Sequence, residues 1–231
     1  MATESEHRTH LEAHGLVIGY PEQTICGPID LRIGTGDGLG IIGSNGSGKS
    51  TLLATLLGRI PAQSGETAFR GLPLDEDSLD FRRTVAVQVS DGAFFEELSV
   101  AEHLEMVARG HGVPEWEAKV ESELEFFELT AVADHLPGEL SSGQRRKLLL
   151  AATLIRPAGL LIFDEPEQRL DLRIRQKFYE RLAGLRRDMV SILAVTHDPA
   201  MLRLCLDRAL LLDGDAGEYV ESEDGAQWLE R

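Results

Sequence analysis

The sequence predicts an α/β fold with a parallel central sheet. Three stretches, residues 39–43, 160–163 and 190–195, are apolar at consecutive rather than alternate positions, which is typical of strands buried on both faces. Each stretch is followed by turn residues or by a segment that favours a helix. Strands that alternate with helical segments in this way form parallel sheets covered by helices.

Shorter strands are expected near the N-terminus, at residues 16–20, 29–33 and 66–70, separated by turn signals such as GTGDG. They indicate an antiparallel sheet that flanks the α/β core. The histidines of this region are His7, His10 and His14, whose spacing a helix would bring to one face. With no cysteine beside them, we expect a solvated or frayed segment here rather than a metal site.

A helical pattern occupies residues 94–156. Val120, Leu124 and Phe127 have the i, i+4, i+7 spacing of one helix face, and prolines break the pattern. We therefore expect a helical insertion between strands of the core.

The chain carries a large excess of acidic residues. Its 231 residues include 39 Asp and Glu against 23 Lys and Arg, a formal net charge of −16. Nucleic-acid phosphates and anionic membrane surfaces both attract basic faces, so neither is an expected partner. The apolar runs are far shorter than the roughly 18 residues of a membrane span, and the first residues lack the apolar region of a secretory signal. A cytoplasmic location is expected.

A phosphate-binding motif follows the first predicted core strand. The segment GSNGSGKST fits G-x-x-x-x-G-K-[ST] and leads into an apolar helical pattern. Glycines let backbone N–H groups surround phosphates, and the helix start adds its positive dipole end. Lys49 would reach the β- and γ-phosphates, and Ser50 would ligate Mg²⁺. The candidate nucleotide-binding residues are Gly43, Ser44, Asn45, Gly46, Ser47, Gly48, Lys49, Ser50 and Thr51.

Two carboxylates end the second predicted core strand, LLIFDE. Asp164, at the carboxyl end of a buried strand, suits Mg²⁺ because hard cations prefer oxygen ligands. Glu165 points the other way in the strand alternation and can polarise an attacking water, which favours hydrolysis over transfer to a substrate. A solvated acidic pair is the alternative interpretation.

The segment LSSGQ at 140–144 precedes a predicted helix. Ser141 and Gln144 have the spacing of a capping box, which alone would explain them. The same helix start offers a hydroxyl and free N–H groups to an anion. The two roles are compatible.

These motifs, together with VTHD at 195–198, resemble in order and spacing those of the ATP-binding subunits of ABC transporters. The resemblance implies a P-loop NTPase (RecA-like) core with an N-terminal antiparallel β subdomain and an inserted helical subdomain. It implies one ATPase domain over residues 1–231, with the helical part at about 94–156.

The resemblance also implies roles for single residues. Tyr20 would stack on adenine, Gln88 would sense Mg²⁺ and assist catalysis, and His197 would contact the γ-phosphate and orient the water. Ser141 and Gly143, with Gln144, would bind the ATP held by a second subunit. Each has a purely structural alternative, such as a core aromatic or a polar strand end.

The implied function is an ATPase that drives transport. Two ATPase subunits, identical or paralogous, would close head to tail on ATP and Mg²⁺ and power separate membrane-spanning subunits, at the inner face of the cell membrane. A stand-alone regulatory ATPase of the same superfamily is the alternative. A phosphate-loop kinase would leave LSSGQ and His197 unexplained.

Two positions depart from the family pattern. The segment LSSGQ at 140–144 corresponds to the signature segment of the family, and Ser142 stands where that segment usually has glycine. A residue with a side chain fits there only if its φ is not positive. Gln168 stands where the family favours a small or hydroxyl residue, in a loop that contacts the second subunit. Both departures bear on communication across the dimer, while Asp171 is retained.

Overall fold

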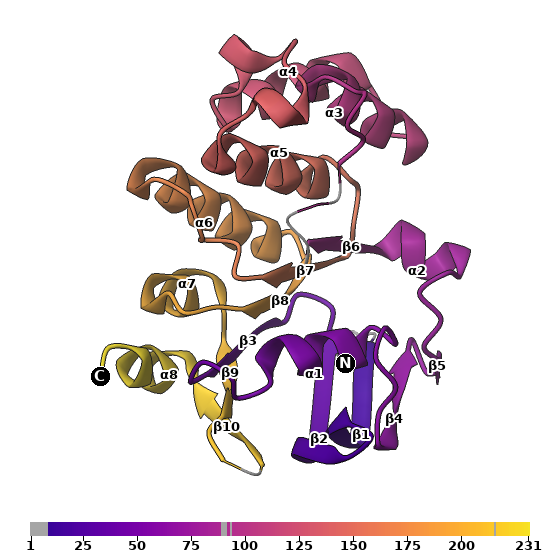
Figure 1. Ribbon diagram of the computed structural model, residues 1–231, viewed down its shortest axis with the longest axis vertical. Helices are drawn as coiled ribbons and strands as arrows, with labels where there is room; N and C mark the ends of the chain where they lie inside the picture. Colours follow the sequence, from indigo (N-terminus) through magenta and orange to yellow (C-terminus); the bar gives the residue numbers. More distant parts are fainter. Residues whose placement is uncertain (1–8, 89–91, 93, 215) are drawn as a thin grey trace, which may run out of the picture.

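Two β-sheets form the framework of the structure, a computed structural model that describes residues 9–88, 92, 94–214 and 216–231 (Figure 1). Within these residues the smaller sheet has the strand order β2-β1-β4-β5, and the larger has the order β10-β9-β3-β8-β7-β6. Helices pack against the larger sheet, so the fold is α/β, as the sequence predicts.

The larger sheet is parallel apart from its last strand. Its strands are β3 (Gly38–Gly43), β6 (Val85–Gln88), β7 (Leu160–Asp164), β8 (Ser191–Val195), β9 (Arg208–Leu212) and β10 (Gly217–Glu221). Every pairing from β9 through β3, β8 and β7 to β6 is parallel, whereas β10 is antiparallel to β9. The three core strands expected from consecutive apolar residues are confirmed as β3, β7 and β8.

Both faces of this sheet are buried, each in its own hydrophobic core. In β7, Leu161 and Phe163 join the core that includes side chains of α5 to α8, while Leu160 and Ile162 join the core built with α1 and the smaller sheet. Successive strand residues point to opposite faces, so every position must be apolar. The helices are α1 (Lys49–Leu56), α2 (Leu79–Thr84), α3 (Val100–Gly110), α4 (Trp116–Phe126), α5 (Ser142–Leu154), α6 (Leu172–Arg187), α7 (Pro199–Cys205) and α8 (Ser222–Leu229).

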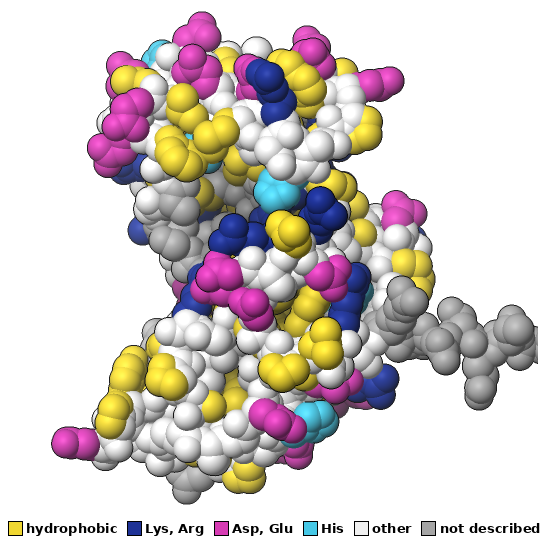
Figure 2. All heavy atoms as spheres, turned by 90° about the vertical axis from the view of Figure 1, so that its right-hand side faces the viewer, with side chains coloured by type: hydrophobic (Ala, Val, Ile, Leu, Met, Phe, Trp, Pro, Cys, Tyr) yellow, Lys and Arg dark blue, Asp and Glu magenta, His cyan; other side chains and the backbone are white. Residues whose placement is uncertain are grey.

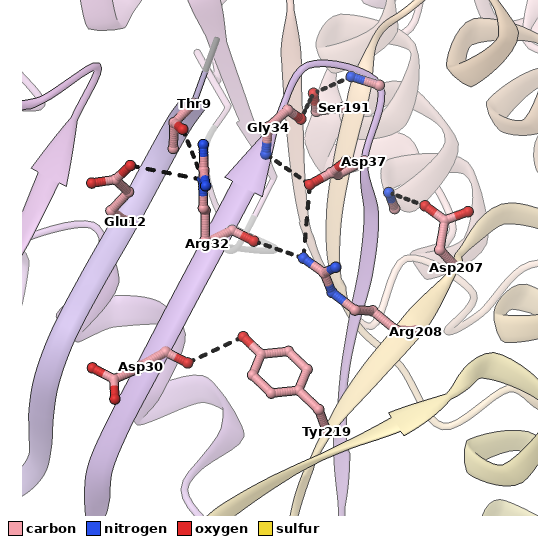
Figure 3. Close-up of polar contacts among 12 residues, drawn as sticks. Thr9, Glu12, Asp30, Arg32, Gly34, Asp37, Ser191, Asp207, Arg208 and Tyr219 are labelled. Carbon is pink, nitrogen blue, oxygen red and sulfur yellow. Dashed lines mark hydrogen bonds and ion pairs between the residues drawn. The ribbon is translucent and has the colours of Figure 1, made fainter. Parts of the chain in front are cut away.

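The smaller sheet is antiparallel, as predicted, and its first strands are longer than expected. It contains β1 (Thr9–Tyr20), β2 (Gln23–Gly34), β4 (Ser64–Phe69) and β5 (Leu72–Pro73). Its edge strand β2 lies along the C-terminal strands (Figure 3). There the Tyr219 hydroxyl donates to the Asp30 carbonyl at 3.1 Å, and Arg208 donates to the Arg32 carbonyl at 3.0 Å. These bonds tie the two sheets together.

The expectation of a solvated or frayed segment is wrong for His10. This residue lies in β1 with 5% exposure, and its Nε2 is 3.4 Å from the Thr35 hydroxyl. Burial lowers its pKa, and the charge of Arg70 lowers it further. Because β1 pairs with β2 on one side and with β4 on the other, its first residues are held in the sheet. His14 on the same strand is exposed, and His7 lies outside the described residues.

The expected helical region contains α3, α4 and α5, with 3₁₀ turns at Thr130–Val132 and Pro137–Glu139, and forms the upper part of Figure 1. A buried ion pair joins it to the core. Glu123 of α4 is fully buried and accepts bonds of 2.7 and 2.5 Å from Arg181 of α6. Arg181 also lies over the Phe126 ring, 4.8 Å from its centre.

The polar C-terminal residues form β10 and α8, neither of which the sequence pattern indicated. β10 is a partly exposed edge strand. The fully buried residues of α8 are the small Gly225 and Ala226, while Trp228 and Leu229 are only partly buried against the core, so neither element carries a strong apolar signal. Among the described helices, none is both long enough and apolar enough to cross a membrane.

Replacing Arg181 by alanine should destabilise the protein by about 3 kcal/mol, because the fully buried Glu123 carboxylate would lose its bidentate partner. Urea unfolding measures the change. Arg203→Ala is the matched control: Arg203 pairs with Glu223 and Glu230, but at the surface, where ion pairs contribute little. An equal loss in the two variants would contradict the role given to burial.

His10 should make the fold sensitive to mild acid. Its pKa is lowered in the folded chain, so the unfolded chain takes up the proton first, and stability falls as pH drops below about 6.5. Between pH 7.5 and 5.5, His10→Gln should lose less unfolding free energy than the unmodified protein, as measured by urea titration. An unchanged pH dependence in His10→Gln would contradict the role given to this buried imidazole.

Candidate nucleotide site at the carboxyl edge of the sheet

The predicted phosphate loop connects β3 to α1. Gly43, Gly46 and Gly48 have φ values of 152°, 83° and 96°. A Cβ at Gly43 would lie 2.3 Å from the Leu212 carbonyl oxygen, and one at Gly48 would lie 2.5 Å from Ile25. Glycine is therefore required at both ends of the loop by backbone conformation and by space. Ser44, Asn45 and Gly46 at its rim are exposed, and Ser47 and Thr51 are half-buried.

Lys49 begins α1 and lies beneath the loop with 6% exposure. Its ammonium donates to the carbonyls of Gly43 at 3.0 Å and Ser44 at 2.8 Å. Burial lowers the pKa of Lys49, and the negative charges of Glu165 and Asp164 oppose that shift. The structure thus holds a cation against the loop backbone, at the start of a helix whose N-terminus favours anions.

Three side chains with oxygen atoms lie at this edge: Ser50 in the first turn of α1, Asp164 at the end of β7 and Gln88 at the end of β6. Asp164 ends β7 and accepts a hydrogen bond from Ser50, while burial raises its pKa. Gln88 ends β6, which pairs with β7. The buried Asp164 Oδ1 and both polar atoms of the Gln88 amide have no hydrogen-bond partner within the described residues. Unpartnered oxygens of this kind fit a hard cation such as Mg²⁺.

Glu165 faces away from Asp164 and toward the loop after β8. Its backbone N–H donates to the Val195 carbonyl at 2.9 Å, and its carboxylate Oε1 lies 3.3 Å from Nε2 of His197. Glu165 has a φ of 49°, in the left-handed region that side chains seldom adopt. The two adjacent carboxylates therefore contact different partners, one beside Ser50 and one beside His197.

Arg146 supports this edge from α5, and nothing in the sequence pattern marked it. It is 5% exposed and donates to the Asp164 carbonyl at 2.8 Å and to the Glu165 carbonyl. In sequence it belongs to the run RRK, and charge runs on helices are usually solvated. Only the packing of α5 beside β7 turns one of these cations inward.

The signature segment lies apart from the phosphate loop. Ser141 caps α5: its hydroxyl accepts from the Gln144 N–H at 3.2 Å, and its own N–H donates to Gln144 Oε1 at 2.8 Å. This confirms the predicted capping box. Ser141 is exposed, and α5 lies in the upper part of Figure 1, away from α1. Ser142 begins α5 and is not among the residues with positive φ, so its side chain is accommodated.

Gly143 and Tyr20 complete the predicted set. A Cβ at Gly143 would lie 3.1 Å from the Arg169 carbonyl oxygen, so α5 passes close to the loop after β7. Tyr20 ends β1 with 52% of its surface exposed, and its carbonyl accepts from Gln63 at 2.5 Å. One chain therefore gathers Lys49, Ser50, Gln88, Asp164, Glu165 and His197 at one sheet edge, and leaves the signature residues elsewhere.

Comparison with known proteins gives a consistent result. Residues 26–168 match the family model described as ABC transporter. An ABC transporter ATP-binding protein of Streptomyces coelicolor is 33% identical over 88% of this chain and 80% of its own length. The Nod factor export ATP-binding protein I of Burkholderia thailandensis is 31% identical, over 91% of this chain and 72% of its own.

Solved structures show the same fold. The ATP-binding subunit of an ABC transporter superposes with a TM-score of 0.83 at 25% identity, over 94% of this chain and 91% of the other. A dimeric ATP-binding cassette in a post-hydrolysis state, bound to ADP and Pi, gives 0.79 at 21% identity, over 92% and 98%. Together with the family match, these similarities show that the chain belongs to the ABC transporter family, as an ATP-binding ATPase subunit.

Proposed function

We propose that the chain hydrolyses ATP in composite sites, each shared between two ATPase subunits. One observation carries this proposal: the phosphate loop and the acidic strand end share one edge of the sheet, whereas the exposed, capped start of α5 faces solvent elsewhere. The first N–H groups of a helix have no acceptor within the helix, so a helix start can bind an anion. A second subunit, placed head to tail, would bring its Ser141 and Gly143 to the ATP on the phosphate loop. The dimeric ATP-binding cassette among the solved structures supports the pairing of two subunits.

The residues at the sheet edge fit distinct steps of hydrolysis. Residues 43–51 would bind the phosphates, Lys49 would direct its ammonium to the β- and γ-phosphates, and Tyr20 would stack on the base. Ser50, Asp164 and Gln88 would hold Mg²⁺, which when bound supplies positive charge against the phosphate oxygens.

Glu165 would take the proton of the attacking water onto its carboxylate, and His197, 3.3 Å away, would orient that water. The Glu165 carboxylate contacts His197 and is not one of the oxygens proposed to hold Mg²⁺, so it remains available to accept a proton. Closure of the dimer on ATP, before hydrolysis, would exclude bulk water. It would also bring Ser141, Gly143 and Gln144 of one subunit into contact with the ATP of the other.

We further propose that residues 1–231 act as one ATPase domain, whose inserted helical part, about 94–156, contacts membrane-spanning subunits at the inner face of the membrane. A cavity of about 290 Å³ lies where the insertion meets the core, lined by Gln88 and by residues of α3 and α5. In Figure 2 basic side chains gather at mid-height, below the acidic side chains of the helical part. The names of the relatives, one of which refers to export and the other to an ABC transporter, support this partner class.

Glu165→Gln should bind ATP but lower kcat about 100-fold or more, because an amide cannot accept the proton of the water. The variant should accumulate as an ATP-dependent dimer in gel filtration. Lys49→Ala, in contrast, should weaken ATP binding itself, as measured by a fluorescent nucleotide analogue. Turnover by Glu165→Gln at the unmodified rate would contradict its role as the base.

Ser141→Arg should abolish ATP-dependent dimerisation while each subunit still binds ATP, because the added side chain would occupy the proposed contact with the second nucleotide. Ser78→Arg is the matched control: Ser78 caps α2 in the same way, accepting from Phe81, but lies outside the signature segment. Gel filtration with and without ATP measures the difference. Dimerisation by Ser141→Arg would argue against the composite site.

A further inference from the structure

A carboxylate that the sequence pattern did not single out is buried beside the proposed catalytic pair. Glu167 lies in the loop between β7 and α6 with 7% exposure. Its Oε1 accepts two hydrogen bonds, each of 2.8 Å, from the Thr196 hydroxyl and from the backbone N–H of His197. Thr196 is itself fully buried. The carboxylate therefore joins the loop that carries Glu165 to the loop that carries His197.

Burying the Glu167 carboxylate is unfavourable for folding unless its contacts compensate for the loss of water. Burial raises the pKa of Glu167, the two hydrogen bonds oppose that shift, and the negative charge of Asp198 adds to it. Its second oxygen, Oε2, has no hydrogen-bond partner within the described residues. An apolar side chain of similar size would fill the space without removing a carboxylate from water.

The contact has a clear geometric effect. β8 ends at Val195, so the N–H of His197 lies beyond the strand ladder, and Glu167 supplies its acceptor. The Thr196 hydroxyl, which donates to Glu167, also accepts from the Asp198 N–H at 3.0 Å. One carboxylate thus restrains three consecutive residues, 196–198.

On the other side of the same junction, the Glu165 N–H donates to the Val195 carbonyl at 2.9 Å. The two loops are therefore linked at two points, with the contact between the Glu165 carboxylate and the His197 imidazole between them. Restraint from both sides limits the positions that the imidazole can take relative to the carboxylate.

We propose that Glu167 is a positioning residue for ATP hydrolysis. Its buried carboxylate holds the backbone of residues 196–198, so that the His197 imidazole stays beside the Glu165 carboxylate. This rests on the proposed function, because it assumes that His197 acts in turnover. What the position requires is a hydrogen-bond acceptor, so glutamine, whose amide oxygen can accept the same two bonds, can replace glutamate.

The test compares steady-state ATPase kinetics of Glu167→Ala, Glu167→Gln, His197→Ala and the double variant Glu167→Ala/His197→Ala. Glu167→Ala should lower kcat about tenfold or more while KM for ATP changes less than about threefold. Glu167→Gln should keep at least about a third of the original kcat. In the double variant, kcat should equal that of His197→Ala, because Glu167 acts only through the histidine.

Asp207→Ala is the matched control. The Asp207 carboxylate also accepts a backbone N–H, that of Gly38 at 2.9 Å, but at the opposite end of β3 (Figure 3). It should keep the original kcat even where thermal stability falls. If Glu167→Ala does not fold, Thr196→Val removes the bridging hydroxyl and should likewise lower kcat with KM little changed.

Multiplicative losses in the double variant would overturn the proposal, as would a Glu167→Gln variant as impaired as Glu167→Ala. A uniform rise in KM with unchanged kcat would also overturn it. These outcomes differ from a failure of the proposed function, in which His197→Ala itself would turn over ATP at the unmodified rate.

Discussion

The parallel register of β3, β8 and β7 is the constraint on which the candidate site depends. These strands end at the same edge of the larger sheet, so the phosphate loop, the acidic pair and the histidine loop meet there although they are far apart in sequence. The apolar side chains that fill both cores keep the strands in that register. Packing and function are thus linked, because a shift of one strand would displace every group at its end.

A second feature is the contrast between the global charge and the local charge. The chain has a formal net charge of −16, yet the phosphate loop is built from a buried lysine, backbone N–H groups and a helix start. Overall charge governs solubility and bulk partners, whereas a preorganised pocket depends on the few groups that line it. The expectation that nucleic acid is not a partner and the binding of a small polyanion are therefore compatible.

Buried polar contacts add specific links between elements that the hydrophobic cores also hold together. Arg146 joins α5 to the end of β7, Glu123 pairs with Arg181 between α4 and α6, and Glu167 joins the loops after β7 and β8. Each spans segments distant in sequence, and each residue type is common on surfaces. For this reason no local pattern identifies them. The burial of His10, which depends on strands distant in sequence, escapes a local pattern in the same way.

The sequence by itself determined the α/β class, the three buried core strands, the phosphate loop and the capping box of α5, because these depend on local spacing and on consecutive apolar residues. It did not indicate β10 and α8, because most of their apolar side chains are only partly buried. Only the tertiary structure decided which polar side chains are buried, which carboxylate faces which partner, and that the signature segment stands apart from the phosphate loop within one chain. Such facts follow from the packing of distant segments, which side-chain type and spacing do not encode.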